Sequence, residues 1–334
     1  MDRLYGLFLA LLCCVLTTAE FNVPTISFDD GFAPLFGQGN IVRTDNGTGV
    51  RLLLDRFTGS GFISSKMYKY GFFSALIKLP RSHTAGLCVA FYLSNGDVFE
   101  KNHDELDIEF LGHVEGKPWR FQTNMYGNGS TNRGREERYS LWFDPSKEFH
   151  RYSILWTSKD IKFFVDDIPV REVARSAEMG GEYPSKPMQL YVTIWDASAW
   201  ATAGGKYKTN YKYAPFVALF RGLALDACAV DLIQETTEGA YCTKTDAWSA
   251  YSAVSLKQKA AMRRFRQRYM SYSYCYDVVR YPVPPPECVI DPIEKQRFKE
   301  TGRLKFGGSH PSRRRRSRTS PVERTNVEDD DDAM

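Results

Sequence analysis

The stretch from His103 to Gly112 contains the residues best suited to chemistry in this chain. Acidic residues occupy positions 105, 107 and 109, and apolar Leu106, Ile108 and Phe110 alternate with them. Successive side chains of a β-strand point to opposite faces, so this spacing places three carboxylates on one face and three apolar side chains on the other. Neighbouring carboxylates repel one another and serve no structural purpose in a strand, which indicates a functional site.

Two carboxyl groups on one strand can cleave a glycosidic bond. Glu105 and Glu109 are four residues apart, which corresponds to about 13 Å between their Cα atoms on a flat strand. Side chains that lean inward on a curved strand close much of this gap, and a carboxyl separation of about 5–5.5 Å suits retaining cleavage. One carboxylate then attacks the anomeric carbon while the other protonates the leaving oxygen. Asp107, between them, can share a proton or a hydrogen bond with a neighbour and so separate the pKa values.

An alternative reading of the three acids is a metal site with oxygen ligands. We rank it second because the spacing matches no EF-hand loop. The sequence contains no dedicated cluster of metal ligands, so we expect neither a metal nor a cofactor.

The chain around this stretch has the pattern of short β-strands. From about residue 21 to 216, apolar residues alternate with polar ones between turn-forming residues. Asp166-Asp167 separates two such runs and is typical of a hairpin turn. Many strands at this spacing predict an all-β sandwich or jelly roll. A further strand is expected over Phe220–Val230 and one helix over Ser252–Met270. The clearest strand runs are Gly71–Leu79, Gly86–Ser94, Leu106–Leu111, Trp119–Tyr126, Tyr152–Thr157, Ile161–Val165 and Gln189–Trp195.

Composition excludes several classes of protein. With 43% hydrophobic and 14% aromatic residues, the chain can bury a large core and is neither disordered throughout nor collagen-like. A net charge of +4 is too small for a dedicated nucleic-acid binder.

The one long apolar run, Leu7–Leu16, follows Arg3 and precedes small residues, which predicts a signal peptide over residues 1–19. We therefore expect a secreted protein without a transmembrane segment.

The cysteines and sequons fit secretion. Local spacing favours pairing of Cys228 with Cys242 and of Cys275 with Cys288, one of three possible connectivities. Cys88 lies in an apolar run and is expected to be a small buried hydrophobe. The tripeptides at Asn46 and Asn128 are candidate glycosylation sites.

The chain after about residue 311 is charged. Arg313–Arg316 and Arg318 are basic, and Glu328–Asp332 is acidic, a composition typical of disordered tails. Such a tail is either simply solvated or makes a weak contact with an anionic polymer, such as pectin.

The acidic strand resembles the E-x-D-x-E signature of glycoside hydrolase family 16. In fuller form, His103–Gly112 is similar to the H-D-E-I-D-F-E-F-L-G of plant xyloglucan endotransglucosylase/hydrolases. The resemblance extends over about residues 25 to 308. Its other motifs are Gln122-Thr123-Asn124, Gly129–Glu136, Trp195–Thr202, Tyr269–Cys275 and Arg280-Tyr281-Pro282.

The resemblance implies a β-jelly roll whose concave sheet forms a polysaccharide cleft. Glu105 would be the nucleophile, Glu109 the general acid/base, and Asp107 the residue that orients Glu105. The implied organisation is a signal peptide (1–19), a catalytic domain (20–219), a disulfide-bearing C-terminal extension that lengthens the cleft (220–290), and a charged tail (291–334).

Several polar and aromatic residues are expected to bind the sugar chain. Alternate residues of Trp119–Tyr126 form a polar face suited to a cleft, and flat aromatic rings suit pyranose faces. By contrast, the arginines at 263, 264, 266 and 268 on the late helix are expected to be mostly solvated. The binding residues expected from the resemblance and from residue type are Tyr92, Gln122, Asn124, Arg135, Glu136, Trp195, Trp200, Ala201, Gly205, Tyr272 and Arg280.

Three features depart from the common pattern of that family. No sequon follows Gly112, the segment Gly96–Asn102 is longer than in many members, and a charged tail follows the extension. These features resemble the divergent third subgroup, which contains both transglucosylases and hydrolases.

Three functions follow from these observations. The first is a monomeric xyloglucan endotransglucosylase of the plant cell wall, in which a second xyloglucan chain accepts the cleaved one. The second is an endohydrolase that passes the same intermediate to water. The third is a wall-binding lectin on the same scaffold, which Glu105 and Glu109 disfavour because a lectin needs no acid/base pair.

Overall fold

Two antiparallel sheets face each other in the computed structural model, which describes residues 23–231, 248 and 253–305. The nine-stranded sheet consists, in spatial order, of β1 (Phe32–Phe36), β4 (Ser60–Ser64), β13 (Gln189–Asp196), β6 (Leu87–Ser94), β7 (Glu105–Leu111), β8 (Arg120–Tyr126), β9 (Glu137–Tyr139), β15 (Met270–Asp277) and β16 (Thr301–Arg303). The seven-stranded sheet consists of β12 (Ile168–Ala174), β11 (Asp160–Val165), β10 (His150–Trp156), β5 (Met67–Lys78), β14 (Phe216–Val230), β3 (Gly49–Leu54) and β2 (Ile41–Thr44). The predicted all-β sandwich is confirmed.

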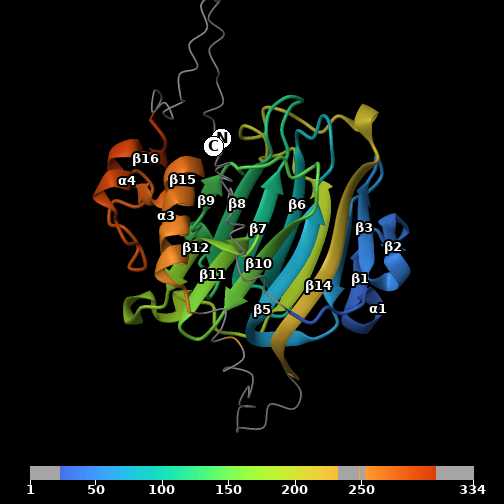
Figure 1. The fold of residues 1–334 in the computed structure, drawn as a ribbon, viewed down its shortest axis with the longest axis horizontal. Coiled ribbons are helices and arrows are strands. Elements are labelled where there is room, and N and C mark those ends of the chain that lie inside the picture. Colours follow the sequence, from blue (N-terminus) through green and yellow to red (C-terminus); the bar gives the residue numbers. More distant parts are fainter. Residues whose placement is uncertain (1–22, 232–247, 249–252, 306–334) are drawn as a thin grey trace, which may run out of the picture.

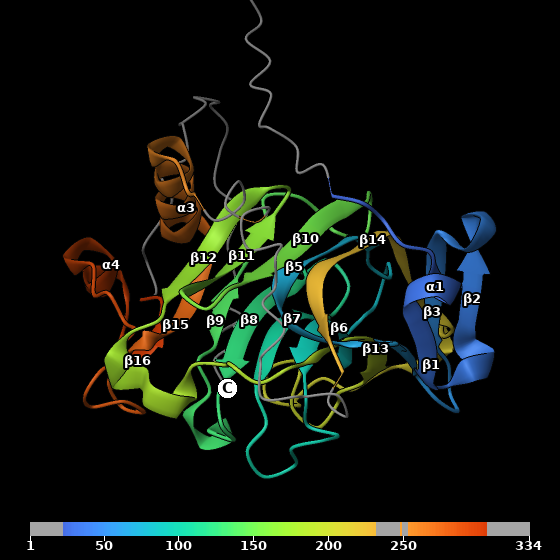
Figure 2. The ribbon, with the colours of Figure 1, turned by 90° about the horizontal axis from the view of Figure 1, so that it is seen from below.

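Helices lie at the two ends of the sandwich. Helix α3 (Leu256–Tyr269) and α4 (Pro292–Arg297) stand beside β15 and β16, and the short α1 (Phe28–Gly31) lies at the opposite end (Figures 1 and 2). Within the described part of the chain, no helix is both long and apolar enough to span a membrane.

The period-two pattern of β7 and β8 decides which face of each strand enters the core. Leu106, Ile108 and Phe110 are fully buried between the sheets, and the Phe110 ring packs edge-on against Tyr152 of β10 at 4.7 Å. Burial of each such side chain stabilises the fold by about 1.5–3 kcal/mol. The acidic residues between them must therefore face outward, on the surface of the nine-stranded sheet.

Local elements largely follow the sequence. Asp166 and Asp167 adopt positive φ angles of 48° and 60° between β11 and β12, which confirms the hairpin turn. The predicted helix is α3, which begins with a capping box between Ser255 and Gln258. The expected strand over 220–230 is the second part of the longer β14.

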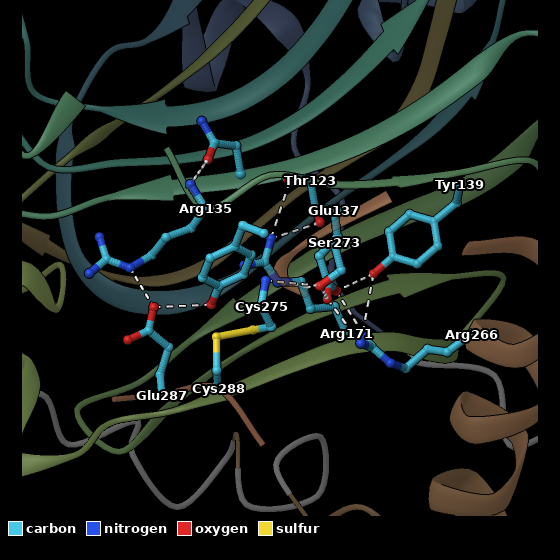
Figure 3. Close-up of polar contacts among 12 residues, drawn as sticks. Thr123, Arg135, Glu137, Tyr139, Arg171, Arg266, Ser273, Cys275, Glu287 and Cys288 are labelled. Carbon is cyan, nitrogen blue, oxygen red and sulfur yellow. Dashed lines mark hydrogen bonds and ion pairs between the residues drawn. A yellow bond between two sulfur atoms is a disulfide. The ribbon is translucent and has the colours of Figure 1, made fainter. Parts of the chain in front are cut away.

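A buried ionic cluster joins the sheets to α3 (Figure 3). The carboxylate of Glu137, only 2% exposed, accepts hydrogen bonds from Arg266 (2.6 Å), Ser273 (2.8 Å) and Tyr139 (2.5 Å). Arg171, from β12 in the other sheet, lies 3.6 Å from the same carboxylate. The expected solvated face of α3 contains Arg263, Arg264 and Arg268, which are exposed, whereas the Glu137 carboxylate draws the guanidinium of Arg266 inward.

The predicted start of the charged tail, residue 291, is too early in the chain. Residues 291–305 form α4 and β16 instead of continuing as tail. Asp291 caps α4, Glu294 is buried against Arg266, and Phe298 stacks on Tyr276 at 4.9 Å. These buried contacts fix a segment that looks merely charged in the sequence.

The predicted Cys275–Cys288 disulfide is present, and Cys88 is buried with a free thiol, as expected. Cys242 lies outside the described residues, so its pairing with Cys228 stays a prediction. The signal peptide and the basic and acidic blocks after residue 305 also lie outside the described residues.

Substitution of Glu137 by Gln should lower the free energy of unfolding by about 3–5 kcal/mol, because it removes the buried carboxylate that Arg171 and Arg266 share. Burial alone would raise the pKa of Glu137, but Arg266 and Arg171 lower it to about 2. This stabilisation is therefore complete above the unfolded-state value of about 4.3 and is lost as the pH falls through about 2. Urea unfolding of both proteins across this range measures the difference.

Glu172→Gln is the matched control for that experiment. Glu172 is exposed on the opposite face of β12, with its carboxylate 3.4 Å from Lys162. Asp160 lies closer to the same buried ammonium, at 2.6 Å, and keeps it paired, so the loss of Glu172 should cost no more than about 1 kcal/mol. Equal destabilisation by the two substitutions would contradict the role given to the cluster.

Candidate active site

Glu105, Asp107 and Glu109 share one face of β7 and line a cleft of about 670 Å³. The neighbouring strands place Ser94 and Tyr126 beside Glu105, Tyr92 and Asn124 beside Asp107, and Ala90 and Gln122 beside Glu109. The complete lining is Phe36, Ala90, Tyr92, Glu105, Asp107, Glu109, Gln122, Asn124, Tyr126, Glu136, Arg138, Thr193, Trp195 and Trp200.

Six of the expected binding residues lie on this lining. They are Tyr92, Gln122, Asn124, Glu136, Trp195 and Trp200. Sequence reasoning missed four lining residues, which are Phe36, Ala90, Arg138 and Thr193. Arg138 could have been found, because it lies two residues after Glu136 and so points to the same side of the strand.

A second cavity of about 690 Å³ adjoins the first and contains two more of the expected residues, Tyr272 and Arg280. Glu136 and Arg138 line both cavities, so the two are parts of one surface. The complete lining is Glu136, Arg138, Tyr272, Asp277, Val279, Arg280, Lys299, Thr301 and Arg303.

Arg135 does not line the cleft, and this corrects the expectation. Its side chain is 1% exposed and its guanidinium bonds Glu182 and Glu287, the latter at 2.5 Å. It therefore ties the β8–β9 connection to the segment that ends in the disulfide (Figure 3).

Ala201 and Gly205 also lie off the cleft lining, in the loop after β13. Ala201 is half-buried against the cluster that contains Cys88. Gly205 has a φ of 85°, and a Cβ atom there would lie 2.4 Å from the carbonyl oxygen of Ala199. Both residues shape the loop that carries Trp200, whose ring centroid lies 6.1 Å from that of Trp195.

The candidate glycosylation sites are both exposed. Asn46 and Asn128 adopt positive φ angles of 54° and 52° in turns. Occupancy of these sites stays a prediction.

Glu109 is set up to hold a proton. Burial raises the pKa of its carboxyl to about 7, and the charge of Glu105 adds to this effect. Gln122 opposes the shift by donating from Nε2 to Glu109 Oε2 at 2.6 Å, and Arg138 in turn donates to Gln122 Oε1 at 2.7 Å. Cys88 lies beneath, with its Sγ 3.9 Å from Glu109 Oε1.

Asp107 holds a proton that it donates in a hydrogen bond to Glu105. Burial and the charges of Glu105 and Glu109 raise the pKa of Asp107 well above its usual value, so Asp107 is the protonated partner. Burial also raises the pKa of Glu105, but hydrogen bonds from Ser94 and Asp107 and the nearby His103, at 4.0 Å, oppose this rise. The arrangement favours an ionised Glu105 that accepts a hydrogen bond from a neutral Asp107.

Asp104, next to this row, has a structural role that the sequence did not reveal. Its fully buried carboxylate accepts hydrogen bonds from the backbone N–H groups of Asn128, Ser185 and Lys186 and from the Lys186 side chain, each at 2.8 Å. It holds two loops against the start of β7 and so fixes Glu105.

The described residues contain no group of three or more His, Cys, Asp or Glu side chains arranged to hold a metal ion. The acidic row itself offers a carboxyl group that holds a proton, Glu109, and a carboxylate that accepts a hydrogen bond, Glu105.

Comparison with known proteins identifies the family. Residues 28–213 match the model of glycosyl hydrolases family 16, and residues 242–288 match that of the xyloglucan endo-transglycosylase (XET) C-terminus. The chain is 64% identical over 317 residues to "Probable xyloglucan endotransglucosylase/hydrolase protein 30" of Arabidopsis thaliana, covering 93% of this chain and 92% of the relative. It is 62% identical to protein 29 of the same plant, covering 90% and 89%.

Solved structures agree on the fold. A prokaryotic β-1,3-1,4-glucanase (lichenase) from a mouse hindgut metagenome matches with a TM-score of 0.50 and 23% identity, over 62% of this chain and 100% of that one. The laminarinase catalytic domain of Thermotoga petrophila matches with a TM-score of 0.50 and 19% identity, over 63% and 97%. With this fold, the match over residues 28–213 defines a family 16 glycosyl hydrolase domain. Within that class, the chain belongs to the xyloglucan endotransglucosylase/hydrolase family.

The pKa of Glu109 predicts the alkaline limit of activity. With Glu109 in the expected role of general acid, kcat/KM should fall as the pH rises through about 7, where its carboxyl loses the proton. Gln122→Ala removes a hydrogen bond that stabilises the charged form, so the alkaline limb should move up by about one pH unit. Initial rates on a soluble polysaccharide donor across pH measure the shift.

Gln189→Ala provides the control. Gln189, on β13, donates to the Ser64 carbonyl at 2.7 Å and is not part of the cleft lining. An alkaline limb that stays in place in Gln122→Ala, or that moves equally in both variants, would contradict the assignment.

Proposed function

We propose that this protein is a retaining xyloglucan endotransglucosylase. The observation that supports this proposal most strongly is the acidic row of β7. In this row, burial raises the pKa of Glu109 to about 7, while Asp107 donates a hydrogen bond to Glu105. One strand thus carries an acid that is protonated near neutrality and a nucleophile that is ionised. Membership of the xyloglucan endotransglucosylase/hydrolase family supports xyloglucan as the substrate.

In the first step, a Glu105 carboxylate oxygen attacks the anomeric carbon of a backbone glucose. The bond from that carbon to the O4 atom of the next glucose breaks, and Glu109 gives its proton to this O4. The products are a glycosyl ester on Glu105 and the released end of the donor chain.

In the second step, Glu109 is the base. It takes the proton from the 4-hydroxyl of another xyloglucan chain, whose oxygen attacks the anomeric carbon while the ester bond to Glu105 breaks. Two displacements on the same carbon retain its configuration, and both carboxyl groups return to their starting states.

The shape of the site supports an attack within long chains. Trp195, Trp200 and Tyr92 present flat rings along the cleft, and the lining continues past Glu136 and Arg138 into the second cavity. A surface of this extent can hold sugar units on both sides of the scissile bond. It also offers an acceptor chain a place to bind before water reacts, which favours transfer over hydrolysis.

Organisation and location are further parts of this proposal. We assign residues 20–219 to catalysis and 220–290 to an extension of the cleft, in accord with the two family models matched. We propose export through the predicted signal peptide, glycosylation at Asn128 or Asn46, and action as a monomer on xyloglucan donor and acceptor chains in the plant cell wall.

The deciding experiment supplies the secreted protein with xyloglucan and a labelled xyloglucan oligosaccharide. Transfer predicts that label enters polymer without new reducing ends. New reducing ends with little incorporation would instead make the protein an endohydrolase. Binding of xyloglucan without any turnover would make it a lectin and refute both enzymatic functions.

The two catalytic roles are separable with azide. Glu105→Ala and Glu109→Ala should each lose at least about 10²-fold in transfer. With an activated aryl glycoside donor, azide should react at the space left in Glu105→Ala and yield an inverted glycosyl azide. In Glu109→Ala, azide should attack the glycosyl ester and yield the retained product. Nuclear magnetic resonance of the products assigns the configuration.

Glu172→Ala, a carboxylate on β12 that does not line the cleft, should keep full activity. The opposite pattern of azide products would exchange the two roles, and full activity of Glu105→Ala would remove the mechanism.

A further inference from the structure

Arg138 lies between the acid/base and the C-terminal part of the chain. Strand β9 runs between β8 and β15 (Figure 1), and register pairs Arg138 with Gln122 on one side and with Tyr272 on the other. Gln122 in turn pairs with Glu109. Directly paired residues point to the same face of a sheet, so these four side chains form one line across the sheet.

The side chain of Arg138 is in contact on both sides. Its Nε atom donates to Gln122 Oε1 at 2.7 Å, and its guanidinium lies 5.0 Å from the centroid of the Tyr272 ring. The backbone is held as well, because the Arg138 carbonyl accepts a hydrogen bond from Ser271 Oγ at 3.2 Å. A half-buried guanidinium with contacts on two neighbouring strands has little freedom to turn away from Gln122.

This contact decides which way the Gln122 amide points. A guanidinium has only donors, whereas an amide side chain has a donor end and an acceptor end. Arg138 can therefore bond only the oxygen of Gln122, which turns Nε2 toward Glu109, where it donates to Oε2 at 2.6 Å. The reversed amide would place its NH2 group against the guanidinium and its oxygen against the Glu109 carboxyl group.

The direction of the amide matters for the proton of Glu109. A donor beside a carboxyl group stabilises the ionised form, whereas an acceptor stabilises the protonated form. The positive charge of Arg138 has the same sign of effect, since it also lowers the pKa of Glu109. Burial and the charge of Glu105 oppose both effects.

Arg138 acts against acidic neighbours of Glu109. Burial keeps Cys88 a neutral thiol by raising its pKa, and Glu136 is paired with Arg280 at 2.8 Å. The cation that favours an ionised Glu109 within this group is therefore Arg138. The titratable side chains that act on or contact Glu109 are Glu105 and Asp107 on β7, Cys88 on β6, and Glu136 and Arg138 on β9.

We propose that Arg138 is the positioning residue of the acid/base, which fixes the Gln122 amide with its NH2 group toward Glu109. The inference rests on the proposed function, in which Glu109 gives its proton to the leaving oxygen and later takes one from the acceptor hydroxyl. When the proton leaves, Gln122 Nε2–H stabilises the charge that remains on Glu109, and Gln122 itself neither gains nor loses a proton. Because Tyr272 belongs to β15, the C-terminal part of the chain contributes to this positioning.

The pH dependence of kcat/KM tests this role. Arg138→Met removes the charge and the donors, so the alkaline limb should move up by about one to two pH units. Arg138→Lys keeps a cation and a donor and should move the limb by less than half as much. A lost contact with the sugar, or a merely structural defect, would lower the rate at every pH and leave the limb in place.

A double-mutant cycle separates the amide from the charge. Gln122→Ala removes the amide, so Arg138→Met on that background should move the limb by about half or less of its shift in the unmodified protein. The shift that remains is the direct effect of the charge on Glu109.

Arg303→Met is the matched control, because it removes the same charge from the same line of side chains. Arg303 pairs with Tyr272, and four strand spacings of about 4.8 Å place it about 19 Å from Glu109. This distance exceeds the screening length of about 8 Å at physiological ionic strength, so the limb should stay in place. Circular dichroism verifies that each variant is folded.

Three outcomes would overturn the inference. They are an alkaline limb that stays in place in Arg138→Met, equal shifts in Arg138→Met and in either Arg138→Lys or Arg303→Met, and additive shifts in the double-mutant cycle. Additive shifts would leave Arg138 with an effect of charge alone. An unmodified enzyme without an alkaline limb near pH 7 would instead remove Glu109 from its proposed role, so the two failures are distinguishable.

Discussion

Burial of the apolar face of β7 is the constraint on which the site depends. Leu106, Ile108 and Phe110 are fully enclosed between the sheets, so the strand cannot rotate or shift by one residue without exposing them. Three carboxyl groups are thereby held together on the outer face, where burial among neighbours raises the pKa of Asp107 and Glu109. The energy of the core thus maintains an electrostatic arrangement that would be unstable on a free strand.

Strand β9 links the sheet that carries the acidic row to the C-terminal part of the chain. Glu137 and Tyr139 face inward into the ionic cluster with Arg171 and Arg266 (Figure 3). Glu136 and Arg138, which alternate with them, line the two cavities. As in β7, alternate side chains of β9 face the interior and the cleft. In β9, however, the inward side chains include an ionised carboxylate that pairs with arginines, whereas in β7 they are apolar. Because Arg266 comes from α3, the helix is anchored to the strand that joins the cavities.

Particular residues mark how far sequence reasoning reached. The acidic row, the polar face of β8 and the Asp166-Asp167 turn were predictable, because each depends on periodicity or on residues adjacent in the chain. Arg135 was misplaced, and the inward contact of Arg266 was not foreseen, because a long cationic side chain can turn to either side of its element. Their buried partners, Glu287 and Glu137, are more than 100 residues away.

The sequence by itself determined the sandwich class, the three carboxylates on one strand face and the resemblance that suggested their roles, since these features are local or repeat with period two. Only the tertiary structure decided that Glu109 is buried enough to hold its proton near neutral pH. It alone placed residues 299–303 beside Tyr272, because pairing of β16 with β15 is a long-range choice that buried contacts of α4 stabilise. Burial and register depend on the whole fold, and no short stretch of residues encodes them.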